Sequence, residues 1–166
     1  MLNYQNHIGI KKEKNSMPEQ PEEGIDKLIS KLKEREDYWN ATIEELSKKL
    51  NCSAKDVVPI QAETISLYQR LNEQIKSMVY EMAKIMPTIK AAKKQRFEYY
   101  AGALAPYPNN ATERMRLIEW DVAKLDQRKD ILDGHIEFLR ISLKDVDNMN
   151  YAVKNKIALY QLADLE

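Results

Sequence analysis

Residues 118–160, IEWDVAKLDQRKDILDGHIEFLRISLKDVDNMNYAVKNKIALY, decide the fold of this chain. Apolar side chains recur in this stretch in alternating steps of four and three residues, and only Lys129 and Asn150 interrupt the stripe with polar groups. Such steps place the stripe along one face of a continuous α-helix and are typical of a coiled-coil seam. The pattern predicts a helix over residues 111–161, which would be roughly 75 Å long at 1.5 Å per residue.

Two more helices are predicted before this one. Residues 61–100 carry an apolar stripe in alternating steps of three and four, with Pro87 inside it. Because a proline removes one backbone hydrogen bond and crowds the preceding turn, we expect a kink near residues 83–86 in a helix that otherwise continues. Residues 25–50 show a similar but weaker stripe, which predicts a first helix.

The connections between the helices are marked by turn residues. Residues 51–59 end at Pro59, which is expected to hold Val58 in an extended conformation. The clearest loop, residues 101–110 (AGALAPYPNN), contains two prolines and ends in two asparagines. Asn110 and Glu113 have the spacing of a capping box and are predicted to open the third helix.

Composition supports an all-α fold with a flexible N-terminal tail. The 166 residues include only four glycines and six prolines, too few for the turns of a many-stranded β-protein. Residues 1–23 mix charges and prolines without an apolar period, so we expect a disordered tail, or alternatively a short recognition segment, before one helical domain at 24–166. Lys plus Arg and Asp plus Glu both number 26, so any nucleic-acid site must come from local clustering of charge.

The sequence contains no recognisable motif for catalysis, metal binding or cofactor binding. The two histidines, His7 and His135, have no partner histidine at helical spacing, and the four glycines stand apart, so no phosphate-binding loop is present. No nucleophile–base set is evident, and we expect a non-enzyme without a cofactor or metal. No apolar run suits a signal peptide or a membrane span, which predicts a cytoplasmic protein with no membrane partner.

The length of the third stripe suggests self-association. One partner helix of about 40 residues could not cover a helix of roughly 75 Å, so part of the stripe is expected to face another subunit, unless the helix bends back. Asn150 could set the register of such a seam or could simply lie near a fraying end. The residues predicted to form the homo-oligomer are Leu132, Ile136, Leu139, Leu143, Val146, Val153, Ile157 and Tyr160.

One segment departs from the alternating charge of the rest of the chain. Residues 82–97, MAKIMPTIKAAKKQRF, contain five cations and no acid. Cations that follow phosphates, with rings that stack on bases, are the groups that bind single-stranded nucleic acid; a solvated basic face is the alternative. Arg96 continues the seam side and could instead pair with Glu98 or a neighbouring helix. The predicted nucleic-acid-binding residues are Lys90, Lys93, Lys94, Arg96, Phe97 and Tyr100.

The end of this basic run resembles a known family. Residues 94–102, KQRFEYYAG, are similar to the signature Lys-x-Arg-hydrophobic-acid-Tyr-Tyr-small-Gly of the UvsY-type recombination mediators of T-even-like phages, and the likeness extends over about residues 41–162. It implies an all-helical, ring-forming protein that binds single-stranded DNA and loads the phage recombinase onto DNA coated by the phage single-strand-binding protein. It also implicates Lys94 and Arg96 in DNA contact, whereas Gln95 and Ala101 depart from the family pattern.

The sequence therefore favours a non-enzymatic, coiled-coil-rich homo-oligomer that binds single-stranded DNA and assists recombinase loading. A structural coiled-coil adaptor or virion assembly protein would explain the heptads equally well, but it leaves the acid-free basic run without a role. An amphipathic helix on a membrane surface is a weaker third reading, because the seams are long and regular and aromatic anchors are few.

Overall fold

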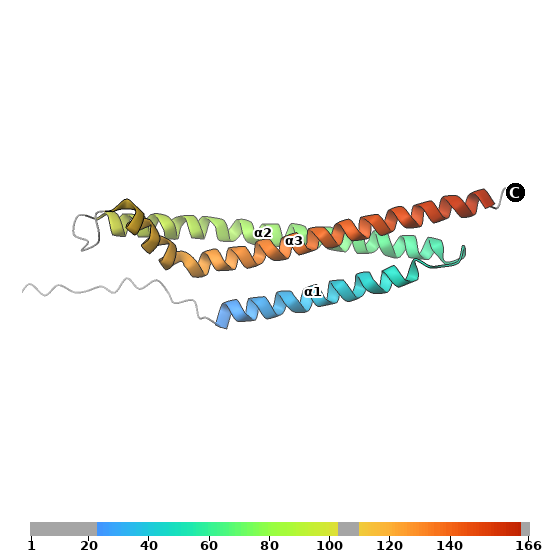
Figure 1. Cartoon of the computed structure of the whole chain (residues 1–166), viewed down its shortest axis with the longest axis horizontal. Helices are drawn as coiled ribbons and strands as arrows, with labels where there is room; N and C mark the ends of the chain where they lie inside the picture. The colour runs from blue at the N-terminus through green and yellow to red at the C-terminus, as the bar shows by residue number, and fades with distance from the viewer. Residues whose placement is uncertain (1–22, 103–109, 164–166) are drawn as a thin grey trace, which may run out of the picture.

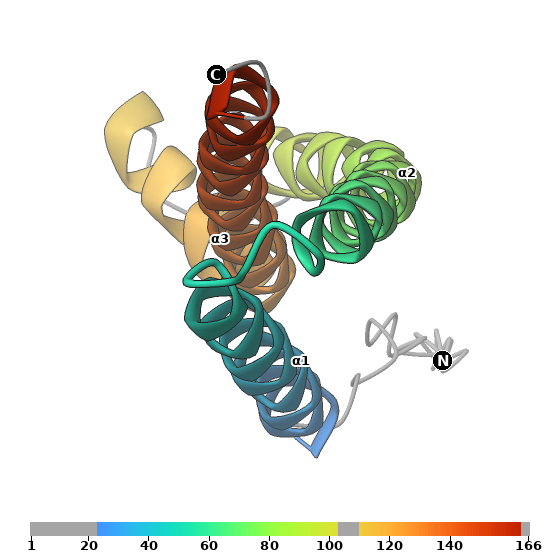
Figure 2. The ribbon, with the colours of Figure 1, turned by 90° about the vertical axis from the view of Figure 1, so that its right-hand side faces the viewer.

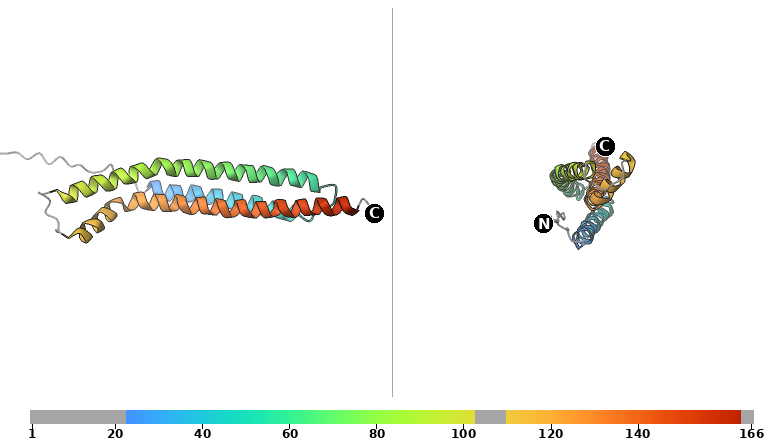
Figure 3. Two further views of the ribbon diagram at one scale, coloured as in Figure 1. Left: turned by 90° about the horizontal axis from the view of Figure 1, so that it is seen from above. Right: turned by 90° about the vertical axis from the view of Figure 1, so that its left-hand side faces the viewer.

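The chain folds into three long helices that lie lengthwise beside one another (Figure 1). The computed structural model describes residues 23–102 and 110–163, and in these ranges it contains α1 (Glu23–Lys49), α2 (Val57–Ala101) and α3 (Ala111–Ala163). Helices α1 and α3 run in the same direction, and α2 runs antiparallel to both (Figures 1 and 3). The all-α prediction is confirmed. The predicted tail lies outside the described residues except for Glu23, which opens α1.

The core follows the predicted stripes of α2 and α3. Leu71 of α2 and three residues of α3, Val122, Leu139 and Val146, are completely shielded from solvent. Because a seam residue of one helix packs between side chains of the facing helix, the two stripes bury each other along the antiparallel pair. Leu67 and Met78 of α2 are buried in the same cluster.

Helix α1 packs chiefly on α3. It contributes Leu32, Trp39 and Leu46 to the core cluster. The carboxylate of Glu36 lies 2.8 Å from Nδ1 of the buried His135 on α3, which adds a polar tie between the two helices. Towards α2, by contrast, α1 leaves a groove of about 360 Å³ whose lining includes the side chains of Lys49, Glu63 and Arg70.

The second helix begins earlier than predicted. It starts at Val57, so Pro59 lies in its first turn and Val58 is helical, which corrects the expected start at Gln61. The physical reason is that the first backbone N–H groups of a helix have no partner within the helix, so a proline there sacrifices no hydrogen bond. Further along, the helix passes through Pro87 without a break, as predicted.

The third helix is continuous over its whole predicted length. The backbone N–H of Thr112 donates a 2.9 Å hydrogen bond to the side-chain oxygen of Asn110, so Asn110 caps the helix as its spacing with Glu113 predicted. Figure 3 shows that the first turns of α3 bend away from the line of the remaining helix. Residues 103–109 of the predicted loop lie outside the described residues.

The stripe predicted to form the oligomer packs within one chain. Five of its members are buried: Leu132, Ile136, Leu139, Val146 and Val153. The remaining three lie half-buried against the same core: Leu143, Ile157 and Tyr160. The length of the stripe does not by itself require another subunit, because α1 and α2 cover it from two sides. For the five buried residues, a role between subunits would require a helix of another chain to replace α1 or α2.

Candidate nucleic-acid interface

Three of the six predicted DNA-binding residues point into solvent from the last turns of α2. Lys90 is exposed, the Lys94 side chain is 79% exposed, and Phe97 is 57% exposed. Positions three and four residues apart share a helical face, so these three side chains form one surface, which we call the outer basic face. Within the described residues, its lysines form one ion pair, a long 3.9 Å contact from Lys94 to Glu98, which leaves them available to an anionic ligand.

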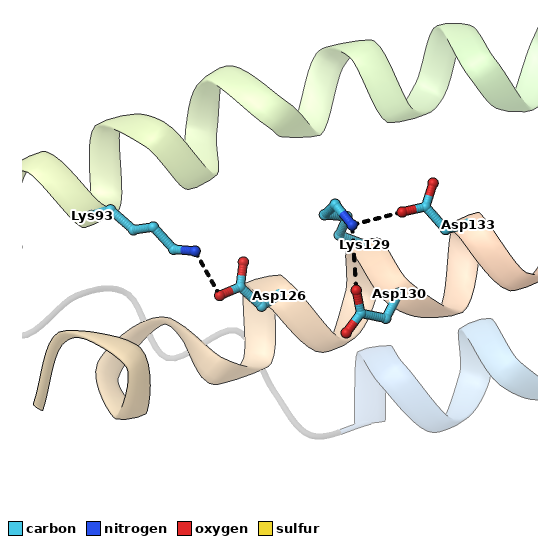
Figure 4. Close-up of polar contacts among 5 residues, drawn as sticks. All are labelled: Lys93, Asp126, Lys129, Asp130 and Asp133. Carbon is cyan, nitrogen blue, oxygen red and sulfur yellow. Dashed lines mark hydrogen bonds and ion pairs between the residues drawn. The ribbon is translucent and has the colours of Figure 1, made fainter. Parts of the chain in front are cut away.

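Lys93 lies at the border between the outer basic face and α3. Its ammonium nitrogen is 2.9 Å from a carboxylate oxygen of Asp126 (Figure 4). Lys129, one turn further along α3, pairs with Asp133 at 2.6 Å and with Asp130 at 3.4 Å. The hydrogen bond to Asp133, followed by that to Asp130, raises the pKa of Lys129. This side of the outer basic face is therefore bounded by the Lys93–Asp126 pair and, beyond it, by a lysine held between two carboxylates.

Arg96 and Tyr100 are turned towards α3. The hydroxyl of Tyr100 donates a 2.8 Å hydrogen bond to Oδ2 of Asp121, and Nε of Arg96 lies 3.3 Å from the same oxygen. Tyr100 is only 9% exposed, so its ring cannot stack on a base without leaving the core. These two residues anchor the end of α2 to α3. For Arg96, this is the alternative of pairing with a neighbouring helix, and the partner is Asp121.

The sequence reasoning missed the two carboxylates that divide the site. Asp121 and Asp126 each lie one position away from seam residues, at Val122 and Leu125. Residues beside a seam lie on its flanks and can reach the facing helix. The apolar stripe of α3 predicts that both carboxylates lie on the flanks of the seam. It does not predict their basic partners, because these depend on the register of α2 against α3.

The Tyr100→Phe variant tests the anchor. We expect it to lower the free energy of unfolding by about 1–3 kcal/mol, because the hydrogen bond that it removes is partly buried and goes to a charged acceptor. Binding to DNA should keep its salt dependence. Tyr151→Phe, which removes a hydroxyl from a 61% exposed ring of α3, is the matched control and should leave stability unchanged in urea unfolding. Equal stabilities for the two variants would argue against the anchor.

Residues 23–102 and 110–163 offer neither a metal-binding cluster nor a membrane-spanning helix. No group of three or more His, Cys, Asp or Glu side chains is arranged to hold a metal ion. None of the three helices combines the length and the apolar character that crossing a bilayer requires.

The fold is similar to that of a solved protein. No family model matches the chain, and neither does a curated protein sequence. The crystal structure of the bacteriophage T4 recombination mediator protein UvsY superimposes with a TM-score of 0.59 and 24% sequence identity, over 72% of this chain and 94% of that one. The resemblance seen in residues 94–102 is thus matched by a likeness in three dimensions, and the chain has a UvsY-like helical fold.

Proposed function

We propose that this protein is a non-enzymatic recombination mediator that binds single-stranded DNA and promotes loading of a recombinase onto DNA coated by single-strand-binding protein. The observation that carries the proposal is the outer basic face, where Lys90, Lys94 and Phe97 stand exposed at one end of a UvsY-like helical fold. The phage recombinase and the phage single-strand-binding protein are the expected protein partners, and the host cytoplasm is the expected location.

The outer basic face suits a single strand for two physical reasons. Lysine ammonium groups four residues apart on a helix are spaced along its axis and can follow a phosphate backbone. An exposed phenyl ring offers a stacking surface that any unpaired base can use, whereas the bases of a duplex are already stacked on one another. The arrangement therefore favours single strands without preference for sequence.

Self-association, with a ring as the expected form, is part of the proposal. A basic face with two exposed lysines makes few phosphate contacts, and several copies would add theirs along one strand. We expect sedimentation velocity to show an assembly larger than a 19.4 kDa monomer at micromolar concentration. A folded monomer over the whole concentration range would contradict this part of the proposal.

A salt titration with single-stranded and double-stranded DNA tests the function directly. We expect tighter binding to oligothymidylate than to a duplex of equal length, and an affinity for the single strand that falls with rising salt as counterions are displaced. Absence of binding at low salt would exclude DNA contact. A structural adaptor or virion assembly protein would then be the better assignment, because that function requires only the heptad pattern and no basic face.

A further inference from the structure

The most exposed large apolar side chain among the described residues is Trp120, near the start of α3. It is 81% exposed, whereas the other tryptophan, Trp39, is buried at 5%. At 100° per residue, Trp120 is about 160° around the helix from the fully buried Val122, so the indole lies on the side of α3 away from α2. In Figure 2 the yellow first turns of α3 project to one side of the bundle, and the exposed fraction of Trp120 shows that no described residue covers the indole.

The indole sits in a row of cations. Arg116 and Lys124 are four residues before and after Trp120, and Arg128 follows one turn later. Residues four apart on a helix are neighbours, so the four side chains form a continuous strip, which we call the tryptophan strip. Arg116 and Arg128 are exposed and form no ion pair with any residue in the described parts of the chain.

Two of the carboxylates near Trp120 are already engaged by residues of α2. Asp121 is engaged by Tyr100 and Arg96, and Asp126 by Lys93, so both are committed to the contact with α2. Two exposed acids, Glu113 and Glu119, lie three residues before and after Arg116, so the strip sets three cations against two acids and keeps a net positive charge. The end of α2 therefore draws two negative charges to one side of α3 and leaves positive charge on the other.

We propose that the tryptophan strip is a second contact surface for single-stranded DNA, in which Trp120 stacks on a base while Arg116 and Arg128 hold the flanking phosphates. This inference rests on the proposed function and adds a site on a different helix from the outer basic face. An exposed ring flanked by Arg116 and Arg128, which form no ion pair within the described residues, matches the needs of a single strand. A protein partner would be expected to need a wider apolar patch, but Leu117 and Ala123 are the only apolar residues three or four positions from the indole.

The two surfaces are physically separate. Lys93 and Asp126 mark the boundary of the outer basic face, while the indole is on the side of α3 that faces away from α2. A strand that contacts both surfaces has to pass around the α2–α3 pair. The proposal therefore predicts a longer footprint on DNA than the outer basic face alone would need.

The test compares Trp120→Ala with Trp120→Phe in the full-length protein. Alanine removes the stacking surface and should weaken binding to oligothymidylate about 5- to 150-fold at an unchanged salt slope, while phenylalanine should retain most of the affinity. Tyr80→Ala is the matched control, because Tyr80 is a 62% exposed ring beside Lys84 on α2 and should have no effect. The Arg116→Gln and Arg128→Gln double variant should flatten the slope by about 1.4.

Tryptophan fluorescence gives a second readout of the same event. Oligothymidylate should quench the emission of the parent protein and leave that of Trp120→Phe, which comes from the buried Trp39, nearly unchanged. If Trp120→Ala binds DNA as the parent does, the tryptophan strip is not a DNA site, while the proposed function stands. If the variant loses only binding to an immobilised recombinase, the strip is a protein-docking surface instead. If the parent itself binds no single-stranded DNA, the proposed function fails together with this inference.

Discussion

Replacing Lys90 and Lys94 by glutamine is expected to weaken binding to single-stranded DNA by about 25-fold at 0.1 M salt, because each lost phosphate contact removes about 0.7 from the salt slope. Adding Phe97→Ala removes a stacking surface worth roughly 1–3 kcal/mol, so the triple variant should lose 100-fold or more. All three side chains are exposed, and the fold should be unaffected. Fluorescence anisotropy of labelled oligothymidylate across a salt series measures both quantities.

The matched control for this prediction removes the same charge elsewhere. Lys31→Gln with Lys33→Gln neutralises two exposed lysines of α1 and should change the affinity only slightly. If both double variants lose affinity equally, the attraction comes from overall charge and the outer basic face has no special role. If neither does, the assignment of Lys90 and Lys94 is wrong.

Truncating Leu139 to alanine should lower the free energy of unfolding by about 2–5 kcal/mol, since the side chain is fully buried and its removal leaves a cavity. Ile141→Ala, two residues along the same helix, changes a 55% exposed side chain and should cost little. Urea unfolding followed by circular dichroism measures the difference. Equal stabilities would show that the stripe is not packed within the chain, and a difference that vanishes on dilution would place its packing between subunits.

The helices were largely predictable from the sequence because each depends on the spacing of apolar residues within its own segment. The spacing of apolar residues in 111–161 needs no knowledge of the partner helix, and the observed α3 ends within two residues of that prediction. The start of α2 was missed because Pro59 was treated as a boundary, although the first turn of a helix tolerates it. The covering of the α3 stripe was not foreseen either, since it depends on two helices packing on α3 at once.

The candidate site was only partly predictable, for a different reason. The run of cations pointed to the end of α2, but it could not separate Lys94, which is 79% exposed, from Arg96, which is turned towards Asp121. That separation depends on which acid of α3 lies opposite each position. Trp120 fell outside the stripe and was given no role, although an aromatic residue off the seam of an amphipathic helix is expected in solvent.

The way in which α1 is attached has a consequence for folding. Helix α1 packs chiefly on α3, and its hydrogen bond to α3 joins residues 99 positions apart in the chain. Its contacts with its sequence neighbour α2, such as the Lys49–Glu63 ion pair at 2.9 Å, are few, whereas α2 and α3 pack against each other extensively. Contacts that close a long stretch of chain cost more entropy and form later, so we expect the α2–α3 pair to form first and α1 to dock onto it. In hydrogen exchange α1 should behave as a separate unit that opens at lower free energy than the pair. The protein would then keep a folded antiparallel pair of helices after α1 has detached.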